Sequence, residues 1–295
     1  MNKRISNKKQ IMSAYEMQFQ NGAEAGKRGV LVQNGALEVF FNVSNALDIL
    51  WVKYKGQNIS FLSKNGLHAP IGEFSADFEG GFLYTCGLNT IGRCVENAYT
   101  HGTLHLHVAD GLRITEDGDK LIVSADVRHS ELFGEELILQ RAYEVYANKL
   151  VIRDTLVNVG YCDAEYALLY HINFGYPFLD ENLKMNIPCK KVVPWDEAWA
   201  NHAYNTFDVP TDNRPEEGYY LYPENGVELI NEALDITCRL HYSTDAFPVT
   251  WQWKAMTSGT YALGIEPATT TATEFTKRKL APNEKREYVI EIDFS

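Results

Sequence analysis

The stretch Arg286-Glu287-Tyr288-Val289-Ile290-Glu291-Ile292-Asp293-Phe294 indicates the fold most clearly. Its even-numbered positions are largely apolar and most of its odd-numbered positions are charged. This period of two is typical of a β-strand with one face in the core and the other in water. The segment Ile236-Thr237-Cys238-Arg239-Leu240-His241-Tyr242 alternates in the same way. Both segments are predicted to be half-buried strands.

Further strands follow at short spacing, at 121–127, 137–146 and 150–159. Between them lie turn signals rich in Gly, Asn and Asp, namely Glu116-Asp117-Gly118-Asp119, Ala147-Asn148-Lys149 and Asn158-Val159-Gly160. The sequence has no long 3.6-residue pattern and no alternation of strand and helix of the kind that builds a parallel sheet. We therefore predict an all-β fold, one large antiparallel β-sandwich.

The chain has 295 residues, 45% of them hydrophobic, which is enough to bury a large core. No Gly/Ser-rich linker divides it, so we expect a single domain over 1–295, with a basic and flexible N-terminal stretch at 1–10. The least regular segment runs from Pro177 to Pro223. A segment of this length is often functional, although it can also cover a sheet edge.

Composition excludes several classes of partner. The net charge of −12 and the pI of about 5.2 disfavour nucleic acid, which binds through clustered Lys and Arg. No apolar run approaches a membrane span and no signal core follows the basic start, so a cytoplasmic protein without a membrane partner is expected. The five scattered cysteines indicate free thiols. The 12% aromatic content suits a sugar site, although tyrosine is also a common strand residue.

An acid/base pair is suggested by two apolar segments. If 165–174 forms a strand, His171 and Asn173 share one face, and the opposite face is core. A lone histidine in such a strand is also often structural. About a hundred residues later, Gly264-Ile265-Glu266 places a carboxylate where few other charges lie.

The segments 249–255 and 260–266 are predicted to form a hairpin around Met256-Thr257-Ser258-Gly259. A turn of two or four residues puts Trp253 opposite Ala262 and Trp251 opposite Gly264, on the face that carries Glu266. The two indoles would then serve either as a platform for the apolar face of a sugar ring or as structural filler. A turn of three or five residues would reverse the faces.

His105-Leu106-His107 would point both imidazoles the same way on a strand, as in some metal sites. The next glutamate is Glu116, beyond a turn-like Asp110-Gly111. We therefore expect no metal at this pair, and ordinary core-edge or surface histidines.

Four blocks in a fixed order carry a family resemblance: Phe78-Glu79-Gly80-Gly81-Phe82-Leu83-Tyr84-Thr85-Cys86-Gly87-Leu88-Asn89, then His101-Gly102, then Leu168-Leu169-Tyr170-His171-Ile172-Asn173-Phe174-Gly175-Tyr176-Pro177, and last Trp253-Lys254 leading to Leu263-Gly264-Ile265-Glu266-Pro267. In this order they resemble a less-studied branch of the aldose 1-epimerase (galactose mutarotase-like) superfamily. The resemblance spans most of the chain. It implies a large antiparallel β-supersandwich.

The resemblance also implies roles for site residues. His171 matches the family's general acid, Glu266 its general base, and His101 its substrate-contacting histidine. Asn173, Trp253 and Arg93 are candidates for further sugar contacts, Arg93 in place of the family's arginine. The family's sugar-binding aspartate has no counterpart that the sequence identifies.

The implied reaction is acid/base ring opening of a sugar, followed by rotation about C1–C2 and reclosure. It needs no cofactor, and it requires an ionised Glu266 and a protonated His171, with side chains on the order of 5–8 Å apart and not paired with each other. A sugar is thus the expected partner, and a homodimer is a further expectation. The rival hypotheses are a non-catalytic carbohydrate-binding or sensing protein, and another sugar-modifying enzyme such as an isomerase or lyase.

Overall fold

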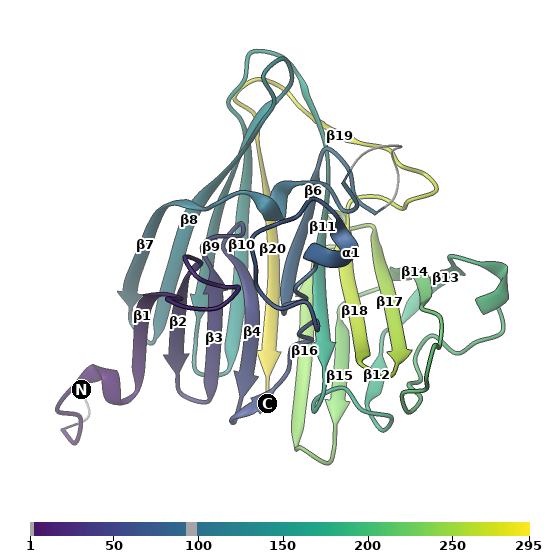
Figure 1. Cartoon of the computed structure of the whole chain (residues 1–295), viewed down its shortest axis with the longest axis horizontal. Helices are drawn as coiled ribbons and strands as arrows, with labels where there is room; N and C mark the ends of the chain where they lie inside the picture. Colours follow the sequence, from purple (N-terminus) through teal and green to yellow (C-terminus); the bar gives the residue numbers. More distant parts are fainter. Residues whose placement is uncertain (1–2, 93–98) are drawn as a thin grey trace.

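A computed structural model describes residues 3–92 and 99–295 of the chain (Figure 1). Within these residues the strands form three antiparallel sheets. The first has the order β1 (Met12–Gln18), β2 (Arg28–Asn34), β3 (Leu37–Asn42), β4 (Asp48–Tyr54) and β5 (Gln57–Asn58). The second has the order β12 (Lys184–Asn186), β15 (Val227–Asn231), β16 (Ile236–Tyr242), β20 (Lys285–Phe294), β10 (Lys149–Asn158), β9 (Glu136–Val145), β8 (Lys120–Ser130) and β7 (Asp110–Asp117).

The third sheet carries the candidate site. Its order is β13 (Cys189–Pro194), β14 (Glu217–Pro223), β17 (Val249–Thr257), β18 (Thr260–Ala268), β11 (Ala164–Gly175) and β19 (Arg278–Leu280), and β6 (Leu83–Leu88) also pairs with β11. Short helices join the strands: η1 (Lys8–Gln10), α1 (Phe74–Asp77), η2 (Leu104–Leu106) and η3 (Glu197–Trp199). The all-β prediction is confirmed.

The main core lies between the second sheet and the other two. In β20 the residues Tyr288, Ile290, Ile292 and Phe294 are all buried, and the charged residues between them are exposed or half-exposed. This is the alternation that the sequence predicts. The large core cluster also takes residues from the first sheet and from the inner face of the third. One sheet therefore closes the back of the sandwich, while two sheets share its front (Figure 1).

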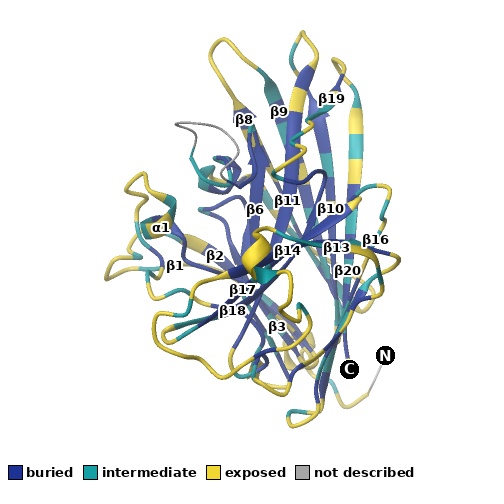
Figure 2. Cartoon of the chain, turned by 90° about the vertical axis from the view of Figure 1, so that its right-hand side faces the viewer, coloured by how far each residue is buried: buried dark blue, intermediate teal, exposed yellow. Residues whose placement is uncertain are grey.

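β11 is buried on both faces, because it lies in the middle of the third sheet beneath a cap. Tyr166, Leu168, Tyr170, Ile172 and Phe174 belong to the main core. On the other face, Ala167 and Leu169 join a second apolar cluster with residues of β17, β18 and the α1 segment. Figure 1 shows α1 in front of β11, and Figure 2 shows β11 and its neighbours as buried. The predicted division of the two faces is confirmed.

The segment from Pro177 to Pro223 is more regular than its sequence suggests. It contains β12, β13, η3 and β14, and β13 and β14 form an edge of the third sheet. Its proline residues lie in loops or at strand ends, where a missing N–H is tolerated. Only the part between β13 and β14 is irregular over a long stretch, and it lies next to the candidate site.

His105 is not on a strand, which corrects the sequence-based picture. It lies in η2, and its ring nitrogens contact Asp48 and Glu79, each at 2.7 Å. The two carboxylates raise the pKa of His105 to about 9 against the opposing effect of its burial. His107 lies beside His129 instead, with ring centroids 5.5 Å apart. The two histidines therefore do not face a common point.

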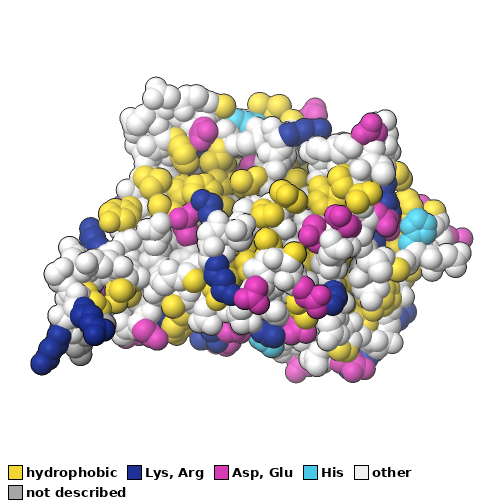
Figure 3. Space-filling view, turned by 90° about the horizontal axis from the view of Figure 1, so that it is seen from below, with side chains coloured by type: hydrophobic (Ala, Val, Ile, Leu, Met, Phe, Trp, Pro, Cys, Tyr) yellow, Lys and Arg dark blue, Asp and Glu magenta, His cyan; other side chains and the backbone are white. Residues whose placement is uncertain are grey.

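Charged side chains of both signs share the surface. On the face seen in Figure 3, Lys and Arg side chains are interspersed with Asp and Glu. Among the residues described, no helix is long and apolar enough to cross a membrane. The four cysteines in the same residues are free thiols.

Candidate active site

His171 and Glu266 occupy opposed positions on neighbouring strands. β11 pairs antiparallel with β18 so that Ile172 lies opposite Ile265. At the next pair of positions, His171 lies opposite Glu266, and both side chains are on the same face of the sheet. Nε2 of His171 lies 3.2 Å from Oε1 of Glu266. The two side chains are therefore in direct contact, which corrects the expected separation of a sugar ring.

A row of residues extends this pair across the third sheet. Tyr84 of β6 lies opposite His171, Trp251 of β17 lies opposite Glu266, and Tyr220 of β14 lies opposite Trp251. Residues at the same level of an antiparallel sheet point to the same face, so this row presents aromatic groups on both sides of the acid/base pair. The register between neighbouring strands thus places the residues of the site side by side.

The pair makes few hydrogen bonds inside the protein. Glu266 is 1% exposed and His171 is 4% exposed. Within the described residues, neither carboxyl oxygen of Glu266 nor Nδ1 of His171 has a hydrogen-bond partner. The 3.2 Å contact between Nε2 of His171 and Oε1 of Glu266 is a close approach and not a hydrogen bond. Buried polar groups are nearly always satisfied, and exceptions often mark functional sites.

Burial also sets the protonation state of the pair. It raises the pKa of Glu266 well above its ordinary value, and Glu216 adds to the rise. Burial lowers the pKa of His171 well below its ordinary value, and His101 lowers it further. Both shifts favour the uncharged forms, a protonated carboxyl group on Glu266 and a neutral imidazole on His171. Desolvation thus opposes the ionised carboxylate and protonated imidazole expected from the sequence.

The pair lies in an aromatic cavity of about 300 Å³. The residues that line it are Phe74, Phe78, Gly92, Thr100, His101, His171, Trp195, Glu216, Tyr220, Trp251, Trp253, Glu266 and Ala272. This volume is at the lower end of the range of small-molecule sites. The structure thus brings together five residues that the sequence singled out, namely His101, His171, Trp251, Trp253 and Glu266.

His101 reaches the cavity from a tight backbone turn. Its φ of 67° and that of Gly102, 75°, are both left-handed, and a side chain at 102 would lie 2.6 Å from the carbonyl oxygen of Thr90. The N–H of Gly92 donates to Nδ1 of His101 at 3.3 Å. Neutral His101 must then carry its hydrogen on Nε2.

Trp251 and Trp253 both come from β17, the strand next to Glu266. The indole of Trp253 is 5.7 Å from the ring of His171, edge to face, and its Nε1 donates to Glu216 at 2.9 Å. Trp251 donates to the carbonyl oxygen of Thr270 at 2.8 Å. Both indoles are therefore fixed by hydrogen bonds as well as by packing.

The hairpin that carries these residues is confirmed, but its predicted register is wrong by two residues. Trp253 lies opposite Gly264, not Ala262, and Trp251 lies opposite Glu266. The turn has two residues between Thr257 and Thr260, so Thr257 continues the strand. A shift of two keeps every side chain on its face, which is why the predicted shared face of the indoles and Glu266 holds.

Gly264 makes room for the pair. A methyl group at this position would collide with Oε1 of Glu266 and would lie 3.1 Å from Cε1 of His171 and 3.2 Å from Cβ of Trp253. Its small size is therefore a condition for the contact between His171 and Glu266.

Gly264→Ala is expected to lower the activity of the site at least tenfold while the protein stays folded, because the added methyl group displaces the carboxyl and imidazole groups. Gly259→Ala serves as a control for a glycine substitution in the same hairpin, since a side chain there meets nothing within 4 Å, although the φ of 81° at Gly259 adds strain. Circular dichroism and activity of both variants check this. Full activity of Gly264→Ala would show that the pair does not need this space.

Asn173 does not line the cavity, which corrects its expected contact with substrate. Its side-chain amide donates to the carbonyl oxygens of Gly81 and His171, at 3.0 and 3.1 Å, and the residue is fully buried. It therefore holds the backbone beside His171. Arg93 lies outside the described residues.

Several lining residues were not identified from the sequence. Phe78 begins the first block of the family resemblance, and Tyr220 belongs to a tyrosine-rich strand, but neither pattern marks a cavity. Trp195 and Glu216 come from the irregular segment between β13 and β14. Their placement depends on how that segment folds back over the sheet, which no local pattern encodes.

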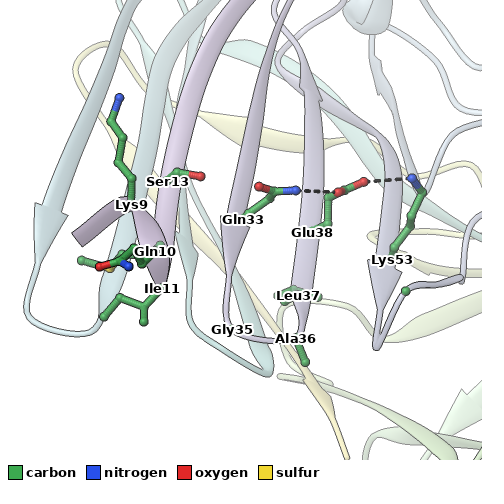
Figure 4. Close-up of a pocket in the computed structure, with 12 residues that line it drawn as sticks. Lys9, Gln10, Ile11, Ser13, Gln33, Gly35, Ala36, Leu37, Glu38 and Lys53 are labelled. Carbon is green, nitrogen blue, oxygen red and sulfur yellow. Dashed lines mark hydrogen bonds and ion pairs between the residues drawn. The ribbon is translucent and has the colours of Figure 1, made fainter. Parts of the chain in front are cut away.

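A second hollow lies at the N-terminal edge of the first sheet (Figure 4). It measures about 330 Å³ and is lined by polar side chains. These side chains bind one another: Gln33 donates to Glu38 at 2.9 Å, and Lys53 lies 3.0 Å from the same carboxylate (Figure 4). Since its polar groups are already satisfied, we place the candidate site in the aromatic cavity.

Comparison with known proteins assigns the family. The family described as "Domain of unknown function (DUF4432)" matches residues 24–293. The chain belongs to this family. No curated protein sequence matches it significantly.

Solved structures establish the fold of this family member. A "putative aldose 1-epimerase" from Klebsiella pneumoniae superposes with a TM-score of 0.87 at 18% identity, over 96% of this chain and 83% of that one. A galactose mutarotase-like protein from Clostridium acetobutylicum has a TM-score of 0.72 at 15% identity, over 97% and 99%. A galactose 1-epimerase from Lactobacillus acidophilus has a TM-score of 0.69 at 14% identity, over 96% and 99%. The predicted galactose mutarotase-like supersandwich is confirmed.

Proposed function

We propose that this protein is an aldose 1-epimerase, an isomerase that interconverts the α and β anomers of a sugar. The observation that supports this most is the contact between His171 and Glu266, a pair with unsatisfied polar atoms in an aromatic cavity. Such a pair can take one proton and give another at adjacent oxygens. The names of the similar structures support the same reaction.

The reaction is a proton exchange at the anomeric centre. One group removes the proton of the anomeric hydroxyl while the other protonates the ring oxygen, which breaks the bond between C1 and the ring oxygen and gives the open-chain aldehyde. Rotation about C1–C2 and the reverse transfers close the ring as the other anomer. Starting from the charge state that burial favours, His171 accepts the first proton and Glu266 donates the second, so the roles are the reverse of those expected from the family resemblance.

The net charge of the His171–Glu266 pair stays at zero throughout this cycle. Ring opening leaves a protonated His171 and an ionised Glu266, and these two forms are what ring closure needs. Each state carries no net charge, so the buried pair never holds an isolated charge, which would be costly. The steps move only protons, and the scheme uses no cofactor.

The cavity walls suit a sugar. The indoles of Trp253 and Trp251 offer flat apolar surfaces for the C–H face of the ring, and His101 adds an imidazole to the same lining. Glu216 is exposed at the cavity and can accept a hydroxyl hydrogen, although it already accepts from Trp253. Polar groups of this kind fix the orientation of a ligand in a mostly apolar site.

We expect kcat/KM to stay within about twofold from about pH 7.5 to about pH 5.5, across the ordinary histidine pKa of about 6.5. The reason is the direction of both shifts: the lowered pKa of His171 keeps it neutral as the pH falls, and the raised pKa of Glu266 keeps it protonated. Activity is lost only when the pair gains a second proton or loses its one proton. A pH profile measured by polarimetry checks this, and an inflection near 6.5 would contradict it.

Polarimetry of freshly dissolved pure anomers tests the function itself. The panel consists of neutral, deoxy, acidic and sulfonated aldoses, and the expected result is faster mutarotation of at least one of them. If a sugar binds and no rotation changes faster than in buffer, the protein is a carbohydrate-binding or sensing protein; the deep burial of Glu266 is the observation that favours this alternative. A new product in the NMR spectrum would indicate another sugar-modifying enzyme.

A further inference from the structure

The connection between β8 and β9 brings together three side chains that can ligate a metal. They are His129, Glu131 and Glu135, and each offers one ligand atom such that the three atoms lie within 4.8 Å of one another. None of them lines the aromatic cavity. The loops near the labels of β8 and β9 are exposed in Figure 2, so an ion has access from solvent.

His129 is unusual among the buried residues. It is 2% exposed, and in the described part of the chain neither of its ring nitrogens has a hydrogen-bond partner. Buried polar groups without a partner are rare and call for an explanation such as an ion that they ligate. One ring nitrogen belongs to the three-atom group, so it lies within 4.8 Å of a carboxylate oxygen of each of the two glutamates.

The backbone brings the two carboxylates to the same place. The N–H of Glu131 donates to the carbonyl oxygen of Glu135 at 3.0 Å, and the N–H of Gly134 donates to that of Glu131 at 3.2 Å. A side chain at 134 would lie 3.1 Å from Oε2 of Glu131. The turn thus holds two like charges near each other beside an imidazole, an arrangement that a cation stabilises.

We propose that His129, Glu131 and Glu135 bind one zinc ion. One imidazole and two carboxylates form a mixed nitrogen and oxygen set, which suits Zn²⁺ better than Ca²⁺ or Mg²⁺, whose ligands are oxygens. Bonds of about 2.0–2.2 Å require the ligand atoms to move closer than their present spacing. Glu131 is exposed and Glu135 is half-buried, so their side chains can make this movement. The ion ties the β8–β9 turn to the body of the second sheet.

Calorimetric titration of chelator-treated protein with ZnCl₂ tests the site. We expect one equivalent of zinc to bind, and affinity to fall at least tenfold in Glu131→Gln and in Glu135→Gln. Neither variant removes a core side chain, so both should fold even if His129→Gln does not. The matched control is His241→Gln, which removes an exposed histidine 3.9 Å from Asp293 on another strand pair and should leave zinc affinity unchanged.

Zinc should raise Tm in the wild type and not in the two glutamine variants, because only a ligand of the folded state stabilises it.

Three results would overturn the proposal: no binding of zinc, equal binding by the wild type and both glutamine variants, or loss of binding in His241→Gln. The site does not rest on the proposed sugar chemistry. Zinc removal is expected to leave anomer exchange unchanged.

Discussion

Glu266→Gln is expected to abolish enzymatic anomer exchange, a loss of roughly 10²–10⁴-fold, the range for removing a general acid or base. Glutamine has nearly the same size, so the cavity and the packing against Trp251 are retained. Its amide can neither give a proton to the ring oxygen nor take one back when the ring closes. The measurement is the rate of mutarotation at saturating sugar, relative to the uncatalysed rate.

The matched control is Glu287→Gln, the same change at an exposed site on β20. It should leave the rate unchanged. Sugar binding by Glu266→Gln, measured by quenching of tryptophan fluorescence, should weaken less than turnover. A rate for Glu266→Gln within about threefold of the wild type would remove Glu266 from the mechanism.

His171→Asn is expected to lower turnover by roughly 10²–10⁴-fold, with a smaller change in sugar affinity. The asparagine side chain is too short to reach the anomeric hydroxyl and has no titratable nitrogen. Its effect should not add to that of Glu266→Gln, because the two groups act as one proton-transfer pair. Rates of both single variants and the double variant give this comparison.

The structural alternative makes a different prediction for the same variant. If His171 served only the core, His171→Asn would lower the unfolding temperature and leave the rate per folded molecule unchanged. His241→Asn, at an exposed position of β16, is the control for the substitution itself. Thermal unfolding followed together with turnover separates the two outcomes.

Local patterns were sufficient for the strands. β20 and β16 alternate apolar and polar residues, and β11 divides into two faces, so all three could be predicted from residue order. The hairpin of β17 and β18 was found for the same reason. Its register was wrong because the sequence did not show that Thr257 belongs to the strand and leaves a turn of only two residues.

Cross-strand neighbours could not be predicted in the same way. The row from Tyr84 through His171 to Trp251 depends on the pairing of strands that are far apart in the chain. The same limit explains Trp195, which comes from a segment that appeared irregular. Asn173 was misjudged for a related reason, since sharing a strand face with His171 does not place its side chain in the cavity.

The state of the acid/base pair was the largest error in the chemical prediction. The sequence showed two groups of opposite charge type, and proximity alone favours an ion pair. It could not show that Glu266 and His171 are both buried, in contact, and surrounded by aromatic side chains. Burial favours the uncharged form of both groups, and in the proposed scheme this reverses the order of the two proton transfers.

Magnetisation exchange between the α and β anomeric protons of an aldose tests the central claim most directly, because the two protons exchange only if the ring opens and closes. With a sugar that polarimetry identifies as a substrate, wild-type protein should produce exchange cross-peaks that buffer does not. These cross-peaks should be absent with Glu266→Gln at the same concentration. Cross-peaks of equal intensity with the wild type and Glu266→Gln, or none with the wild type for any aldose that binds, would contradict the account.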